Sequence, residues 1–116
     1  MDQSFDVADE VVDDVAILTV SGEIDVAAKP TLRTRLDAQL DAGHSTIVVD
    51  LREVTFLDST GLGVLVGALK RCRDVGGDLR LVVEAPRILQ LFTITGLDGT
   101  FRISPSLEGA LGASGN

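Results

Sequence analysis

The pattern of apolar and polar positions divides the chain into short strands and helices. The predicted elements are, in order, strands at 4–12 and 15–21, a helix at about 26–42, a strand at 46–51, a helix at 59–75, a strand at 79–83, a short helix at 86–95, a short strand at 101–103 and a helical turn at 106–111. Strands alternate with helices after residue 15, which predicts an α/β fold with a mostly parallel sheet of about four to five strands and crossover helices. We expect a single domain over residues 1–116, with its core at about 5–111 and a frayed tail at 112–116.

Local signals place the ends of these elements. Gly22 is expected to end the second strand, with residues 23–25 forming a loop. Pro30 suits the first turn of the first helix, and Gly43 is a plausible stop. The apolar face of that helix is Leu32, Leu36 and Leu40. The predicted buried stripe of the second helix is Leu62, Leu65, Val66, Leu69 and Cys72.

Charge and composition narrow the classes of function. The chain has a formal net charge of −8, four Phe, and neither Trp nor Tyr, so we expect no binding to nucleic acid or to anionic membranes. Every charged residue before Lys29 is acidic, which makes either a solvated surface or a face that attracts a basic partner. The single Cys72 excludes an intrachain disulfide and suits a reducing cytoplasm. No signal segment and no apolar run of roughly 18 residues is visible.

Enzymatic and metal chemistry find little support, and no cofactor is expected. Ser59 is not in a Gly-x-Ser-x-Gly turn, and a catalytic triad would have to use His44, the only histidine, which we expect in an exposed turn. Metal-ligand spacing is absent. The glycines at 61, 63 and 67 loosely resemble a dinucleotide-binding fingerprint, so a small nucleotide-binding domain stays open as an alternative.

The most informative segment joins the strand at 46–51 to the helix at 59–75. It places Asp58, Ser59 and Thr60 at a helix N-terminus, where free backbone N–H groups and the helix dipole favour negative charge. Asp58 is the better N-cap of the three, which leaves Ser59 free to face outward. A serine in this position can carry a phosphate with little damage to its own fold.

The glycines of the second helix suggest a surface without side chains. On a helical wheel, Gly63 and Gly67 share one side with Thr60, Val64 and Arg71, away from the apolar stripe. A glycine inside a helix costs roughly 1 kcal/mol relative to alanine, so something is expected to approach the backbone closely. Two alternatives remain: packing against the chain's own elements, or a bare groove offered to a partner protein.

These motifs together resemble a known family. The segment 58–63 (Asp-Ser-Thr-Gly-Leu-Gly), after Phe56-Leu57 and a Val-Val-Asp-Leu strand, resembles the signature of anti-sigma factor antagonists, which are bacterial proteins with the STAS fold. The segment 21–25 (Ser-Gly-Glu-Ile-Asp), followed by Pro30, and the segment 92–97 (Phe-Thr-Ile-Thr-Gly-Leu) resemble other parts of the same family. The resemblance extends over residues 5–111.

The resemblance implies a switch. In that family the unphosphorylated antagonist binds an anti-sigma factor, which is a serine kinase of the GHKL type, and so releases a sigma factor. The kinase phosphorylates the serine that corresponds to Ser59, and a PPM-type phosphatase reverses this. Thr60 supplies a second hydroxyl. The protein would be a cytoplasmic substrate without catalytic activity of its own. The residues expected to contact the partner are Glu23, Asp25, Asp58, Thr60, Gly61, Gly63, Val64 and Gly67. The alternative within the family is a STAS module of another regulatory or transport assembly.

Overall fold

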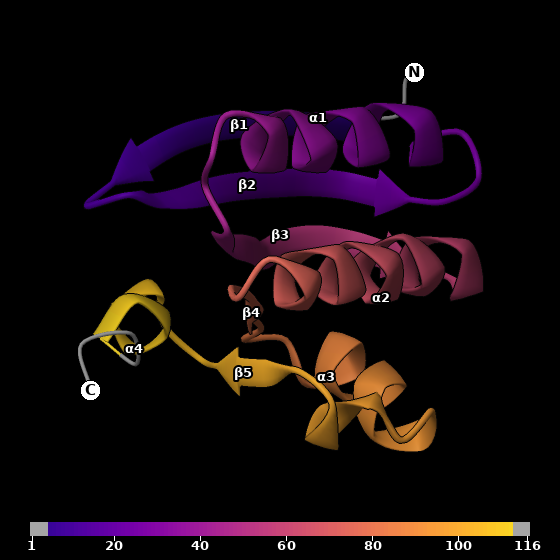
Figure 1. Cartoon of the computed structure of the whole chain (residues 1–116). Coiled ribbons are helices and arrows are strands. Elements are labelled where there is room, and N and C mark those ends of the chain that lie inside the picture. The colour runs from indigo at the N-terminus through magenta and orange to yellow at the C-terminus, as the bar shows by residue number, and fades with distance from the viewer. Residues whose placement is uncertain (1–4, 113–116) are drawn as a thin grey trace.

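The computed structural model describes residues 5–112 (Figure 1). The elements are β1 (Phe5–Val12), β2 (Val15–Ile24), α1 (Lys29–Asp41), β3 (Thr46–Leu57), α2 (Ser59–Asp74), β4 (Asp78–Val82), α3 (Pro86–Ile94), a 3-10 turn η1 (Leu97–Gly99), β5 (Arg102–Ser104) and α4 (Leu107–Gly112). One five-stranded sheet has the order β1-β2-β3-β4-β5. The β1–β2 pair is antiparallel, and all other pairs are parallel. The predicted mixed sheet with crossover helices is therefore confirmed. Of the tail expected to fray at 112–116, Gly112 is the last residue of α4, and residues 113–116 lie outside the described residues.

The helices cover the two faces of the sheet unequally. In Figure 1, α1 and α2 lie side by side across one face. The larger core cluster fills this side and includes Leu18 and Val49 from the sheet. Their neighbours Ile17 and Val48 point to the other face, because successive side chains of a strand alternate, and pack there against Ala110 of α4. The second helix, α2, thus sits on the main core, with its N-terminus at the end of β3.

Two strands run further than the apolar pattern indicates. Gly22 does not end β2, which continues to Ile24, and β3 extends from the predicted end at Leu51 to Leu57. Ile24 pairs with Leu57, after register shifts between residues 19 and 23. Several side chains of the β3 extension, such as Arg52 and Glu53, are exposed and charged. The extension therefore shows no continuous apolar run in the sequence, although its backbone is paired with β2. The extension of β3 carries the chain directly to Ser59.

The first helix also begins later than predicted. A turn over residues 25–28 precedes α1, which starts at Lys29 rather than near Val26. Asp25 holds this turn: its Oδ1 atom accepts hydrogen bonds from the backbone N–H groups of Ala27 (3.0 Å) and Ala28 (3.3 Å). Aspartate commonly stabilises turns in this way. Gly43, with a φ of +95°, follows the helix as expected for a stop.

Candidate functional site

The start of α2 is organised by Asp58. This residue has an extended backbone, and its Oδ1 atom accepts hydrogen bonds from the N–H groups of Thr60 (3.0 Å) and Gly61 (3.1 Å). The Asp58 N–H group lies 3.3 Å from the carbonyl oxygen of Ile24, which ties the end of β3 to the end of β2. Asp58 is therefore the N-cap, as predicted, and its carboxylate is hydrogen-bonded to the backbone of the first helical turn.

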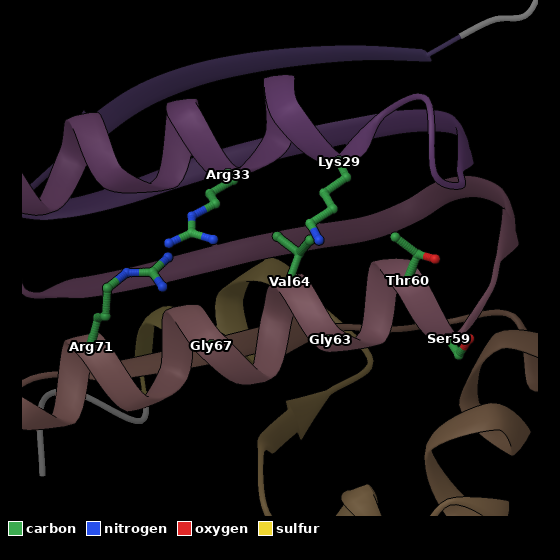
Figure 2. A pocket seen from close by; sticks show the side chains of 8 residues that line it. All are labelled: Lys29, Arg33, Ser59, Thr60, Gly63, Val64, Gly67 and Arg71. Atoms are coloured by element: carbon green, nitrogen blue, oxygen red, sulfur yellow. The ribbon is translucent and has the colours of Figure 1, made fainter.

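Ser59 is the first residue of α2 and is exposed. Its hydroxyl group makes no hydrogen bond to any described residue. Figure 2 shows Thr60 on the side of α2 that faces α1 and Ser59 on the far side of the helix start. Because the cap function is filled by Asp58, the Ser59 hydroxyl is free for a reaction at a helix N-terminus, where added negative charge is favourable.

Gly61 has a structural role. It is buried, and a β-carbon added to it would lie 2.5 Å from Leu57 Cδ1 and 2.7 Å from Ile24 Cγ2. Only a glycine lets α2 approach the ends of β2 and β3 this closely. The close packing of Gly61 on the two strands therefore fixes the position of Ser59. Sequence analysis had instead predicted that Gly61 contacts a partner directly.

Val64 also differs from expectation. Sequence analysis placed it on an open face of α2, but it is 7% exposed and belongs to the main core. The helical wheel considered α2 alone, whereas α1 packs beside α2 on the side to which Val64 points (Figure 2). Val64 instead forms part of the wall of a groove between the two helices (Figure 2).

The groove between α1 and α2 has a volume of about 420 Å³. Its lining residues are Lys29, Arg33, Ser59, Thr60, Gly63, Val64, Gly67 and Arg71. A β-carbon on Gly63 would meet no atom within 4 Å, and one on Gly67 would meet only Arg71 Nη1, at 3.4 Å. Of the two readings of these glycines, the structure therefore favours the bare groove: neither glycine is needed for packing within the described residues.

The groove is basic, which sequence analysis missed. Lys29 and Arg33 reach from α1 toward α2, and Arg71 reaches from α2 toward Arg33 (Figure 2). Arg71 forms an ion pair with Asp37 (2.8 Å), whose carboxylate also lies 3.7 Å from Arg33 Nε. The spacing of Lys29 and Arg33, four residues apart on one helix face, was the available signal. Nothing local in the sequence indicated that this face meets α2.

The acidic residues at the end of β2, Glu23 within the strand and Asp25 directly after it, lie beside the groove rather than in it. Glu23 pairs with Phe56 at the end of the β2–β3 ladder, two residues before Asp58. Glu23 and Asp25 line a separate small hollow with Phe5, Ala27 and Ala28. Val26 and Phe56, at this same end of the sheet, are 70% and 46% exposed. Charged and apolar side chains therefore share the surface around Ser59.

The remaining candidates carry no evident chemistry. Cys72 is buried as predicted, and burial raises the pKa of its thiol to about 11, so the reactive thiolate is disfavoured. His44 is half-buried rather than exposed, with Nδ1 2.8 Å from Gln39 Oε1. The described residues contain no cluster of metal-binding side chains. Within residues 5–112, no helix is long and apolar enough to cross a membrane.

Comparison with known proteins agrees with this geometry. The family model for the STAS domain matches residues 6–110. The chain is 39% identical over 94 residues to the anti-sigma-B factor antagonist of Bacillus subtilis, covering 81% of this chain and 85% of the relative. It is 35% identical over 111 residues to the protein of the same name from Listeria monocytogenes, covering 96% of each. The crystal structure of an anti-sigma factor antagonist from Mycobacterium paratuberculosis superimposes with a TM-score of 0.90 at 33% identity, over 97% of this chain and 96% of that one. The chain belongs to the STAS domain family.

Proposed function

We propose that this protein is an anti-sigma factor antagonist controlled by phosphorylation of Ser59. Its unphosphorylated form binds an anti-sigma factor and thereby releases a sigma factor. The observation that carries the proposal is the state of Ser59: it is exposed, its hydroxyl makes no hydrogen bond to the described chain, and it starts a helix that Asp58 already caps. The names of the relatives supply the class of partner.

The partner is expected to bind across the start of α2 and the groove beside it. Gly63 offers bare backbone there, and Thr60 lies at the same helix start. Lys29 and Arg33 supply positive charge that suits acidic side chains on the partner. Exposed Val26 and Phe56 supply apolar area at the neighbouring end of the sheet. In this proposal Gly61 and Val64 shape the surface from within and do not touch the partner.

A phosphate on Ser59 would weaken this complex while leaving the antagonist folded. Phosphoserine adds roughly −1.5 to −2 charges at neutral pH, which a helix N-terminus tolerates. The anti-sigma factor is proposed to be a serine kinase of the GHKL type, so its nucleotide phosphates would lie next to this surface. Glu23, Asp25 and Asp58 add further negative charge nearby. Like charges and added bulk at the interface then favour dissociation.

The rest of the cycle follows from the same assignment. A PPM-type phosphatase would remove the phosphate and restore binding. The antagonist would serve as a substrate of both enzymes and perform no catalysis. The buried thiol of Cys72 suits a reducing cytoplasm, where we place the protein. Glu23 and Asp25 are proposed to hold the kinase in register, and Asp25→Asn tests this by its effect on the rate of phosphorylation.

The proposal is tested by identifying the residue that is modified. The wild type, Ser59→Ala and Thr60→Ala would be incubated with the cognate kinase and ATP, and the mass of the intact protein and of its peptides would be followed. The wild type and Thr60→Ala should each gain one phosphate on Ser59, whereas Ser59→Ala should remain unmodified. Phosphorylation of Ser59→Ala at the rate of the wild type would refute the assignment.

A further inference from the structure

A second charged cluster lies at the end of the sheet opposite Ser59. Asp78 is the first residue of β4 and pairs with Thr46, the first residue of β3, whereas Ser59 follows the last residue of β3. Three arginines from three elements surround the Asp78 carboxylate: Arg73 near the end of α2, Arg80 in β4 and Arg102 in β5. The cluster therefore draws α2 and the two last strands of the sheet together around one acid.

The contacts inside this cluster are loose. The Nε atoms of Arg73, Arg80 and Arg102 lie 3.6, 3.6 and 3.4 Å from the nearest carboxylate oxygen of Asp78. A hydrogen bond between a guanidinium and a carboxylate is about 2.7–2.9 Å long. Asp78 Oδ1 and Arg80 Nε are both buried, and neither has a hydrogen-bond partner in the described chain. The charges attract one another, but no hydrogen bond joins the three guanidinium groups to the Asp78 carboxylate; Arg73 Nη2 donates instead to the carbonyl oxygen of Thr100, at 3.0 Å.

The burial of Arg80 makes this arrangement unfavourable for the stability of the folded state. Its side chain is only 10% exposed, and its one hydrogen bond is a long contact of 3.4 Å from Nη1 to the carbonyl oxygen of Ala110. A buried charged donor without an acceptor destabilises the folded state. Three positive charges meet one negative charge here, an excess of two positive charges in a chain whose formal net charge is −8. Among the described residues, this cluster therefore carries unbalanced positive charge.

A hollow of about 350 Å³ opens at these side chains. Thr46 and the glycine pair Gly76 and Gly77 complete its lining. Arg102 is exposed, so its side chain has room to adjust to a ligand. Arg73 is exposed as well but donates a hydrogen bond to the carbonyl oxygen of Thr100, and Arg80 is buried. The planar guanidinium group presents its N–H donors in a fork that matches the oxygens of a phosphate.

We propose that this hollow binds a small phosphate-type oxyanion, either inorganic phosphate or the phosphoryl group of a small metabolite. Oxygens of the anion would accept hydrogen bonds from Arg80, Arg73 and Arg102, and two negative charges would balance the excess. The site is separate from the surface around Ser59, so its occupancy does not depend on the proposed phosphorylation switch. It gives the domain a second ligand-binding position at the opposite end of the sheet.

The test is an NMR titration of the full chain with inorganic phosphate, and in parallel with glycerol phosphate, at constant ionic strength. The backbone amide signals of Gly76, Gly77 and Asp78 should shift and saturate, and the probe that saturates at the lower concentration identifies the source of the anion. Arg102→Gln removes an exposed arginine and should weaken binding about tenfold or more, the loss expected for one charge-assisted hydrogen bond. Arg87→Gln, an exposed arginine on α3, is the matched control and should bind like the wild type.

Three results would overturn the proposal. The first is the absence of saturable shifts at these amides with either anion. The second is binding by Arg102→Gln as tight as that of the wild type. The third is saturation of the signals by a glutamate-rich peptide where both phosphate probes fail, which would make this a docking site for an acidic protein segment. The variant Ser59→Glu should bind phosphate like the wild type, so the result does not depend on the proposed function.

Discussion

Gly61 and Ile24 approach one another so closely that no side chain fits between them. A β-carbon on Gly61 would lie 2.7 Å from Ile24 Cγ2 and 3.1 Å from the Ile24 carbonyl oxygen. The same carbonyl group accepts the hydrogen bond from the Asp58 N–H group. The end of β2 thus fixes both the N-cap of α2 and the third residue of the helix, and Ser59 lies between them. The position of the proposed phosphorylation site depends on this contact.

Gly61→Ala should therefore destabilise the free domain. The new methyl group overlaps buried side chains and makes a tight contact with a backbone oxygen, and overpacking of this kind costs about 1–3 kcal/mol. Urea unfolding at neutral pH measures the change. An unfolding free energy equal to that of the wild type would show that the ends of β2 and β3 move apart easily.

Gly63→Ala should have the opposite effect. The added β-carbon meets no atom within 4 Å, so only helix propensity changes, and the free domain should gain up to about 1 kcal/mol. The same urea unfolding experiment measures it, with Gly61→Ala as the matched contrast on the same helix. A clear loss of stability in Gly63→Ala would contradict the open groove.

The variant Gly63→Gln should fold as well as Gly63→Ala, but its longer side chain should block the complex with the anti-sigma factor. A binding titration by calorimetry compares it with Gly63→Ala, which leaves most of the groove open. Tight binding by Gly63→Gln would remove the groove from the interface.

Replacing the N-cap should weaken the start of α2. In Asp58→Ala the N–H groups of Thr60 and Gly61 lose their acceptor, at a cost of about 0.5–2 kcal/mol. Asp58→Asn keeps an acceptor oxygen and should stay close to the wild type. Thermal and urea unfolding of the three proteins are compared. Equal stability of the alanine and asparagine variants would mean that the cap contributes little.

Ser59→Glu should separate binding from stability. A carboxylate at a helix N-terminus is neutral or stabilising by about 0.3–1 kcal/mol, so the melting temperature should hold or rise slightly. Affinity for the anti-sigma factor should fall. Ser59→Gln, of similar size without charge, distinguishes repulsion from bulk. A large drop in the melting temperature of Ser59→Glu would instead indicate that the serine is needed for folding.

The ion pair between the buried Asp50 and the exposed Arg52 in β3 predicts a pH dependence. Asp50 is 4% exposed, and its carboxylate accepts hydrogen bonds from Arg52 Nε (3.0 Å), from one terminal nitrogen of Arg52 (2.7 Å) and from the Arg52 backbone N–H group (3.0 Å). Burial raises the pKa of Asp50, but these hydrogen bonds outweigh burial and hold the pKa below its ordinary value of 3.8. A carboxyl group whose pKa is lowered by folding stabilises the protein above its unfolded pKa, and this contribution is lost as the pH falls through the folded value.

Asp50→Asn should accordingly cost about 1.5–3 kcal/mol at pH 7, the range for hydrogen bonds to a charged group. The difference from the wild type should shrink as the pH falls below about 4, near the ordinary pKa of an aspartate. Urea unfolding across this range measures it, and Glu10→Gln, an exposed acid on β1, is the control. A difference that does not change with pH would exclude the ionised carboxylate as its cause.

Local patterns in the sequence predicted much of the fold and part of the site. The order of strands and helices, the cap at Asp58 and the free hydroxyl of Ser59 all followed from residues close together in the chain. Short-range propensity and periodicity carry such information, because a helix start or a buried stripe depends on neighbours a few residues away. The ends of β2 and β3 were missed because their extension is held by pairing between strands, with exposed side chains that break the apolar pattern.

Only the tertiary structure decided which residues of α2 face the surface. Gly61 and Gly63 are two positions apart and look alike in the sequence, yet Gly61 packs on Ile24 and Gly63 has open space. Val64 is buried because α1 lies beside it, and Lys29 lines the groove because α1 begins at this residue. Contacts between elements distant along the chain determine these roles, and a helical wheel contains no information about them. The sequence by itself determined that a serine stands at the start of a capped helix, and the packing of α2 on the strands and on α1 decided which surface surrounds it.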